Sequence, residues 1–159
     1  RQLLQGPVAL GVVDGLVLPH LNMDGEGERC PFLGDDGRCR VYQARPGICR
    51  IFPLGRFYEH GSFRYFLQTG ECPNRSRTKI RVRKWVDTPD FDRYEGFVAD
   101  WHNFLLELQE HTRKMEDLEQ ARRVSMGLLT EFYLREYDAG KDFYQQFDGR
   151  LEAGKQWLI

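Results

Sequence analysis

The chain has 159 residues, of which 41% are hydrophobic, 13% aromatic and 30% charged, and its formal net charge is −1. This composition excludes a disordered chain, a collagen-like repeat and a disulfide-rich toxin scaffold, and the length suits one domain with or without a helical appendage. No apolar run approaches the roughly 18 residues that a membrane-spanning helix needs, and no secretory signal opens the sequence. We therefore expect a cytoplasmic protein with no membrane partner.

Charge and cysteines are distributed unevenly along the chain. Residues 1–87 carry 14 Lys or Arg against 9 Asp or Glu, whereas residues 88–159 carry 9 against 15. All four cysteines lie in the first, basic part. This asymmetry predicts a cysteine-bearing β module over 1–87 and a helical extension over 88–159 that packs on it.

Three short β-hairpins are predicted in the first part. The Asp-Gly pair at 14–15 stands between apolar runs and tolerates the positive φ angles of a two-residue turn, which predicts a hairpin over about 8–22. A second, shorter hairpin is expected over 30–39 with a cysteine on each arm, and a third turns at the His-Gly pair at 60–61.

Basic residues occupy every odd position from 75 to 83, namely Arg75, Arg77, Lys79, Arg81 and Arg83. Period two is strand spacing, so these side chains are expected on one face of a strand. Such a stripe can neutralise nucleic-acid phosphates, protect a sheet edge, or dock the acidic second part. Nucleic acid is the least favoured partner, because the chain as a whole carries no excess of positive charge.

The second part changes to a helical period. Thr88, Pro89 and Asp90 form a typical helix start, with a capping hydroxyl, a proline at the first helical position and an acid favoured by the helix dipole. A helix is predicted over about 89–112, with an apolar side formed by Phe91, Tyr94, Val98, Trp101, Leu105 and Leu108.

Two further helices are predicted toward the end of the chain. The first, over about 115–134, should turn Leu118, Leu128, Leu129 and Phe132 inward, and the next, over about 141–152, is marked by Phe143, Phe147 and Leu151. The sequence thus predicts an α+β fold, in which a small, irregular antiparallel β module with the cysteines is followed by about three helices.

The four cysteines, Cys30, Cys39, Cys49 and Cys72, are the main candidates for chemistry. Their spacing, C-x8-C-x9-C-x22-C, lacks the C-x2-C knuckle of a zinc ribbon, but three of them stand beside prolines or a Pro-Gly pair that fix the backbone. Cysteine thiolates suit zinc in a tetrahedral site or an iron–sulfur cluster. Buried structural thiols and disulfides are the alternatives.

Two arginines bracket the third cysteine. A cation near a thiol favours the thiolate, so Arg45 and Arg50 are candidates to act beside Cys49. We expect one of them to pair with an acid or a carbonyl that fixes the turn over 46–52, and the other to face the thiolates.

The run CPFLGDDGRCRVYQARPGICRIFP, residues 30–53, resembles the YkgJ-type cysteine-cluster family, also called the CxxCxxCC or zinc- or iron-chelating domain. The resemblance spans roughly residues 8–87. It implies that Cys30, Cys39, Cys49 and Cys72 are metal ligands, for zinc or an iron–sulfur cluster. It also implies that the residues around the third cysteine match the sequence signature of the family, namely Arg45, Pro46, Arg50, Phe52 and Pro53.

The resemblance also concerns cysteines that are not in this sequence. The family is named for a first cysteine cluster, which would lie upstream of Arg1. The site of this chain should then be incomplete or weak, with its thiols reduced or joined in a Cys30–Cys39 disulfide. The main expectation is a metal-binding protein of the bacterial cytoplasm.

A branch of the same family resembles flagellin lysine N-methylases. This branch implies, as an alternative function, a protein lysine N-methylase-like enzyme, or a fragment of one, with a protein substrate and S-adenosylmethionine. The sequence shows no Gly-rich strand–helix turn that would hold a nucleoside, and for this reason the alternative ranks second.

The histidines and the aromatic residues are weaker candidates for a functional site than the cysteines. None of the 4 histidines has a second histidine four positions further on, so the sequence contains no HExxH-like site, and His20, next to a proline, is the one best suited to be a ligand. The aromatic stripe over 57–66, formed by Phe57, Tyr58, Phe63, Tyr65 and Phe66, is expected in the core rather than as a stacking platform.

Overall fold

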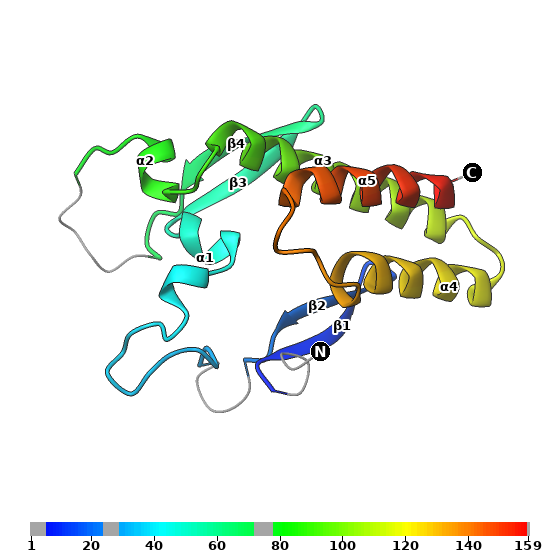
Figure 1. Cartoon of the computed structure of the whole chain (residues 1–159), viewed down its shortest axis with the longest axis horizontal. Helices are drawn as coiled ribbons and strands as arrows, with labels where there is room; N and C mark the ends of the chain where they lie inside the picture. Colours follow the sequence, from blue (N-terminus) through cyan, green and yellow to red (C-terminus); the bar gives the residue numbers. More distant parts are fainter. Residues whose placement is uncertain (1–5, 24–28, 72–77, 159) are drawn as a thin grey trace. The chain divides into compact units, whose positions relative to one another are not determined.

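The computed structural model describes residues 6–23, 29–71 and 78–158, and Figure 1 shows its helices and strands. Its contacts divide the chain into two compact units, one formed by residues 1–40 with 104–159 and the other by residues 41–103. Both units combine a two-stranded antiparallel sheet with helices, which confirms the α+β class. The division predicted at residue 87 stays a prediction.

The first unit begins with the hairpin expected over 8–22. Strands β1 (Val8–Val13) and β2 (Leu16–Leu21) pair antiparallel, with Val13 opposite Leu16. The turn residues Asp14 and Gly15 have φ values of 48° and 87°, the left-handed conformation that Asp and Gly tolerate best. This hairpin contributes Leu16, which is fully buried, to the core of the unit.

The helices of the first unit follow in chain order. They are the end of α3 (Phe91–Arg113), α4 (Leu118–Leu129), the π-helical turn η3 (Thr130–Leu134), α5 (Phe143–Lys155) and the short η4 (Gln156–Leu158). Their buried side chains are Phe104, Leu108, Leu128, Leu129, Phe132, Phe147 and Leu151. Predicted helices are thus confirmed near all three positions, but Leu118 is 80% exposed and does not turn inward, because it is the first residue of α4.

The long helix α3 begins later than the Thr88–Pro89 pattern predicts. Its cap is Asp90, whose carbonyl accepts from Tyr94 N at 3.0 Å and whose Oδ1 accepts from Arg93 N at 3.4 Å. Asp90 has a φ of 47°, a conformation that interrupts the helix before Phe91. The capping group is therefore a carboxylate two residues after the predicted hydroxyl.

The second unit contains the short η2 (Tyr42–Ala44) and α1 (Gly47–Ile51), the strands β3 (Leu54–Glu59) and β4 (Ser62–Leu67), the one-turn α2 (Val82–Val86) and the first part of α3. The hairpin predicted to turn at 60–61 is confirmed, with φ values of 51° at His60 and 74° at Gly61. Asn103 of α3 donates from Nδ2 to the Gly61 carbonyl at 2.8 Å, which ties the turn to the helix.

The β3–β4 hairpin is less buried than its aromatic content suggests. Phe57 and Phe66 share one face, and both are nearly half exposed. Tyr58, Phe63 and Tyr65 lie on the opposite face and are half-buried. The prediction that all five belong to the core is therefore wrong for Phe57 and Phe66. A two-stranded sheet has two faces, and this unit covers only the face that carries the other three rings.

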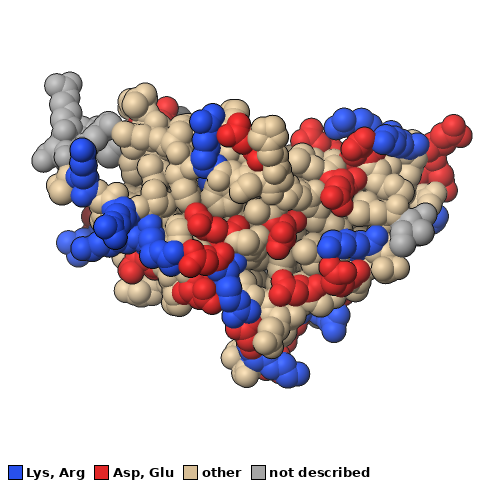
Figure 2. All heavy atoms as spheres, turned by 90° about the horizontal axis from the view of Figure 1, so that it is seen from above, with Lys and Arg blue, Asp and Glu red and all other residues tan. Residues whose placement is uncertain are grey.

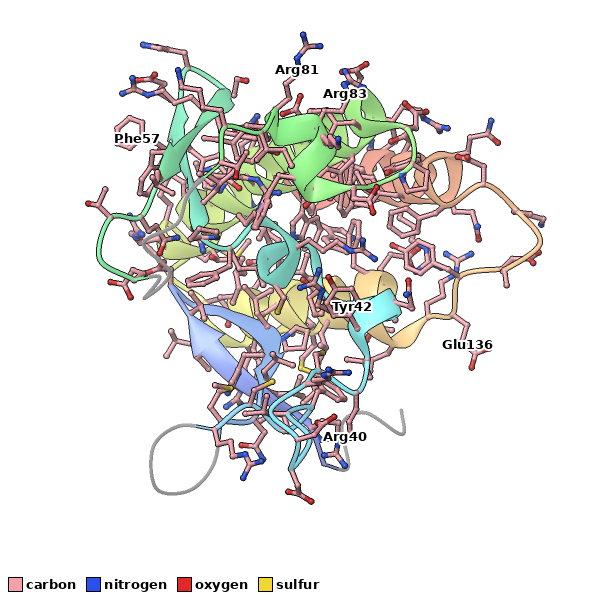
Figure 3. The ribbon with its side chains drawn as sticks, turned by 90° about the vertical axis from the view of Figure 1, so that its left-hand side faces the viewer. Arg40, Tyr42, Phe57, Arg81, Arg83 and Glu136 are labelled. Carbon is pink, nitrogen blue, oxygen red and sulfur yellow. The ribbon has the colours of Figure 1, made fainter. Side chains whose placement is uncertain are left out.

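The described residues of the basic stripe, 79–83, do not form a strand. Arg81 caps the start of α2 and Arg83 lies within that helix, as Figure 3 shows. Residues 75 and 77 lie outside the described part of the chain. Helix formation here buries Val86, which is 1% exposed, and that apolar contact outweighs the strand-like alternation of charges.

Charged side chains of both signs are interspersed on the face seen in Figure 2. Many are local ion pairs, such as Arg83 with Asp92 at 2.6 Å and Arg122 with Glu119 at 3.1 Å. These pairs are exposed, so each contributes little to stability. None of the helices in the described ranges combines the length and the apolar character needed to cross a membrane.

Candidate metal centre

Cys30 and Cys39 lie on one loop that consists of two successive turns. Leu33 N donates to the Cys30 carbonyl at 3.0 Å, and Leu33 also forms an isolated antiparallel bridge with Cys39. Backbone hydrogen bonds of 2.8 and 2.9 Å flank this bridge, so its two side chains form the closely spaced, non-hydrogen-bonded type of pair. The hairpin predicted over 30–39 is thus reduced to one bridge, in which Cys39 faces Leu33.

Both of these thiols are half-buried, and no disulfide joins them. Of the two expected outcomes, reduced thiols or a Cys30–Cys39 disulfide, the structure has the first, and the residue opposite Cys39 is Leu33. Two reduced thiols on one loop are available as ligands for an ion.

Cys49 belongs to the other unit and lies in the middle of α1. The amides of Cys49 and Arg50 both donate to the Pro46 carbonyl, at 2.9 and 3.2 Å, which closes the helical turn behind the proline. Cys49 is half-buried, whereas its neighbour Ile48 is 66% exposed. The Pro-Gly pair before Cys49 thus opens a short helix, as its backbone-fixing character predicts.

Arg50 holds this helix in place through three carbonyl oxygens. Its Nε donates to Arg45 O at 3.2 Å, one terminal nitrogen to Gln43 O at 2.8 Å and the other to Asp87 O at 3.3 Å. The planar guanidinium suits such convergent acceptors. The prediction that one of the two arginines would fix the turn through carbonyls is confirmed, and that arginine is Arg50.

Arg45 has a different contact. Its guanidinium carbon lies 3.9 Å from the centroid of the Tyr42 ring, a cation–π arrangement on the exposed η2 turn that carries Tyr42 in Figure 3. Its Nε is buried and makes no hydrogen bond within the described residues. The orientation of Arg45 toward the thiolates stays a prediction.

Trp85 also supports α1, a role that its sequence context does not indicate. Its indole Nε1 donates to both Ile51 O and Phe52 O at 3.2 Å, at the end of the helix. A tryptophan N–H usually finds an acceptor when it is partly buried, so Trp85 was recognisable as a donor. Its acceptors were not recognisable, because they lie more than 30 residues earlier in the chain.

The predicted four-cysteine site is only partly within the described residues. In the ranges 6–23, 29–71 and 78–158, no three side chains of His, Cys, Asp or Glu come together as potential ligands of one ion. Cys72 lies outside these ranges, and Cys49 belongs to a different unit from Cys30 and Cys39. The convergence of the four sulfurs therefore stays a prediction, as does a ligand role for His20, an exposed residue whose imidazole lies against Gly11.

The chemistry of the described cysteines fits zinc or iron. Thiolates are the ligands that zinc and iron–sulfur clusters take in four-cysteine sites. The three described cysteines are half-buried, each with defined backbone hydrogen bonding nearby, so an ion can reach them without unfolding the turns that carry them.

A comparison with protein-family models gives one match. The model of the CxxCxxCC family, described as a putative zinc- or iron-chelating domain, matches residues 11–80. This range includes all four cysteines, α1 and the β3–β4 hairpin. Neither the curated proteins nor the solved structures gave a match to the chain.

Proposed function

Because residues 11–80 carry a CxxCxxCC domain, we propose that this protein binds zinc or iron through Cys30, Cys39, Cys49 and Cys72. The observation that carries the proposal is the position of these residues, all inside the matched range. The match supports metal binding in general, and the assignment of the four ligands is part of our proposal.

The local structure around the described cysteines supports this choice. Cys39 is fixed by a backbone bridge, and Cys49 lies on a helix held by Arg50 and Trp85 through five hydrogen bonds to carbonyls. A thiol that served only as a small buried hydrophobe would not need a polar frame of this kind. A ligand needs it, because metal affinity depends on the residues that orient the donor atom.

The two metals would have different roles. Zinc bound by four thiolates leaves no open position for water, so it would stabilise the fold. An iron–sulfur cluster would supply electron transfer. In both cases the thiols must be reduced and deprotonated, which fits our proposal that the protein acts in the bacterial cytoplasm.

Metal analysis and absorption spectroscopy of the full chain, purified without oxygen, test the proposal. We expect stoichiometric zinc in a colourless protein or iron in a brown one. Replacing any of the four cysteines by serine should weaken metal binding by more than about tenfold, since a lost ligand costs at least as much as a lost supporting residue.

A matched control is available on the same helix. Ile48→Ser introduces the same side chain beside Cys49 at an exposed position, and it should leave metal binding unchanged. Full metal content in all four cysteine variants would overturn the ligand assignment, and a wild-type chain without zinc or iron would overturn the function. Binding of S-adenosylmethionine by the wild-type chain would instead favour the methylase-like alternative.

A further inference from the structure

The start of helix α1 has a close neighbour on helix α3. A Cβ atom built onto Gly47, the first residue of α1, would lie 2.6 Å from Tyr94 Oη and 3.5 Å from two carbons of the same ring. The first distance is far below van der Waals contact, and the second is ordinary contact. The tyrosine hydroxyl therefore occupies the space that a side chain at position 47 would need, and glycine is required here by lack of room.

The Tyr94 hydroxyl is held in this place by a cation. Arg56 of β3 donates from a terminal guanidinium nitrogen to Tyr94 Oη at 2.6 Å. Tyr94 is 8% exposed, so this bond is largely shielded from water. A hydrogen bond from a charged donor is stronger than one between neutral groups. The position of the phenol ring is therefore well defined.

Arg56 is in turn enclosed by aromatic rings. Its guanidinium carbon lies 5.1 Å from the Phe63 centroid, 5.5 Å from that of Tyr94 and 5.7 Å from that of Tyr65. No carboxylate pairs with Arg56 in the described part of the chain. Burial raises the pKa of Tyr65 to about 12, so that this phenol stays neutral at physiological pH and supplies no counter-charge. Within the described residues, the oxygen of Tyr94 is thus the side-chain acceptor that receives a hydrogen bond from this cation.

We infer that Tyr94 and Arg56 are positioning residues for the cysteine helix: together they determine where α1 begins and hence where the Cys49 thiol, two residues later, is presented. The inference rests on the proposed function for its metal aspect. It assigns a role to residue 94, which lies beyond the range 11–80 that the family model matches. The metal-binding part of this chain therefore extends into helix α3.

A pair of substitutions tests the contact between Gly47 and Tyr94 directly. Gly47→Ala alone should destabilise the protein and weaken metal binding, because its methyl group displaces the hydroxyl. Tyr94→Phe removes that hydroxyl and leaves ring carbons at an ordinary 3.5 Å from the new methyl group. In the Gly47→Ala background, Tyr94→Phe should therefore restore stability and metal affinity in part, although it is harmful by itself. Strictly additive losses in the double variant would overturn the contact.

A second measurement separates positioning from general stability, and it uses Tyr65→Phe as the matched control. Tyr65 also lies beside Arg56, but its Oη makes no hydrogen bond within the described residues. In the metal-free chain, Tyr94→Phe should speed hydrogen exchange at the Cys49 and Arg50 amides by about three- to tenfold, as expected for one lost hydrogen bond. Tyr65→Phe should leave these rates unchanged. In the metal-loaded chain, Tyr94→Phe should alter the thiolate-to-cobalt charge-transfer band of the cobalt-substituted protein, and Tyr65→Phe should not.

The outcomes distinguish the inference from the function on which it rests. Faster exchange confined to α1 in Tyr94→Phe supports the positioning role, even if the wild-type chain binds no metal and the proposed function fails. Equal exchange at these amides in wild type, Tyr94→Phe and Tyr65→Phe overturns the positioning role, even if the wild-type chain binds metal tightly.

Discussion

The backbone amide of Val17 donates a hydrogen bond to Ser125 Oγ at 2.7 Å, although the two residues are 108 positions apart in the sequence. Val17 lies on β2 and Ser125 on α4, and both belong to the first unit. The serine is 2% exposed. An otherwise unpaired strand amide is thus satisfied by a buried hydroxyl, and this bond attaches the first hairpin to the helices.

Loss of that hydroxyl should destabilise the chain. Ser125→Ala leaves the Val17 amide without its acceptor, and we expect the free energy of unfolding to fall by about 1–2 kcal/mol. Urea denaturation followed by circular dichroism measures this change. The control is Ser62→Ala, at an exposed position of β4, which should change stability by less than about 0.5 kcal/mol. Equal effects of the two substitutions would contradict a role for the long-range bond.

Arg50→Lys should be more harmful than its unchanged charge suggests. Lysine keeps the cation but cannot reach three carbonyls with a planar group, so we expect a loss of about 1–2 kcal/mol in stability. Bound metal should decrease as well, since α1 carries Cys49. Arg64→Lys is the matched control, because Arg64 contacts Glu59 in an exposed ion pair at 3.3 Å and the exposed Phe57 ring, and not a set of carbonyl oxygens. The interpretation fails if both arginine variants melt at the wild-type temperature.

The aromatic core of the first unit should tolerate truncation poorly. Phe147 is 2% exposed and its ring lies 6.0 Å from that of Phe132, so Phe147→Ala should cost about 3–5 kcal/mol. Trp101, which belongs to the second unit and which the helical pattern places in the core, is half-buried. Trp101→Ala and Phe143→Ala, the latter at a 41% exposed position, should therefore cost less. Chemical denaturation of the three variants gives the order, and a larger loss for Phe143→Ala than for Phe147→Ala would refute it.

Stability should decrease at mildly acidic pH through His102. Burial against its surroundings, which include a stacked Tyr58 ring at 3.6 Å, lowers the pKa of His102 below its ordinary value of 6.5. The unfolded chain then takes up this proton at a higher pH than the folded chain, so the free energy of unfolding falls as the pH drops below about 6.5.

Denaturation at about pH 7.5 and pH 5.5 measures this dependence. His102→Phe keeps a ring against Tyr58 but cannot be protonated, so the variant should lose less stability on acidification than the wild type. His60→Asn at the exposed turn preserves the positive φ preference and serves as the control. An unchanged pH dependence in His102→Phe would show that His102 does not cause the loss of stability at acidic pH.

The features that could be predicted from sequence are those set by neighbouring residues. The turns at Asp14-Gly15 and His60-Gly61 follow from the φ angles that these residues tolerate. The helix over 91–113 follows from the spacing of its apolar side chains. The cysteine pattern likewise led to the CxxCxxCC family, whose model matches residues 11–80, since a run of closely spaced residues carries the resemblance.

The features that were mispredicted or missed depend on contacts distant in sequence. The alternation of charges at Arg81 and Arg83 predicts a strand, yet burial of Val86 makes the segment helical. The three carbonyls that Arg50 binds and the two that Trp85 binds are main-chain atoms, and any residue type could supply them.

By itself, the sequence determined the local conformations of this protein and the kind of chemistry its cysteines can perform, because both depend on residue type and short-range spacing. Only the tertiary structure decided that the polar frame of the Cys49 helix includes Tyr94, forty-seven positions after Gly47 in the printed sequence. The residue types of Tyr94 and Gly47 do not by themselves indicate that the two are in contact. The contact arises because β3 places Arg56 where it fixes the hydroxyl, and that depends on how the chain packs.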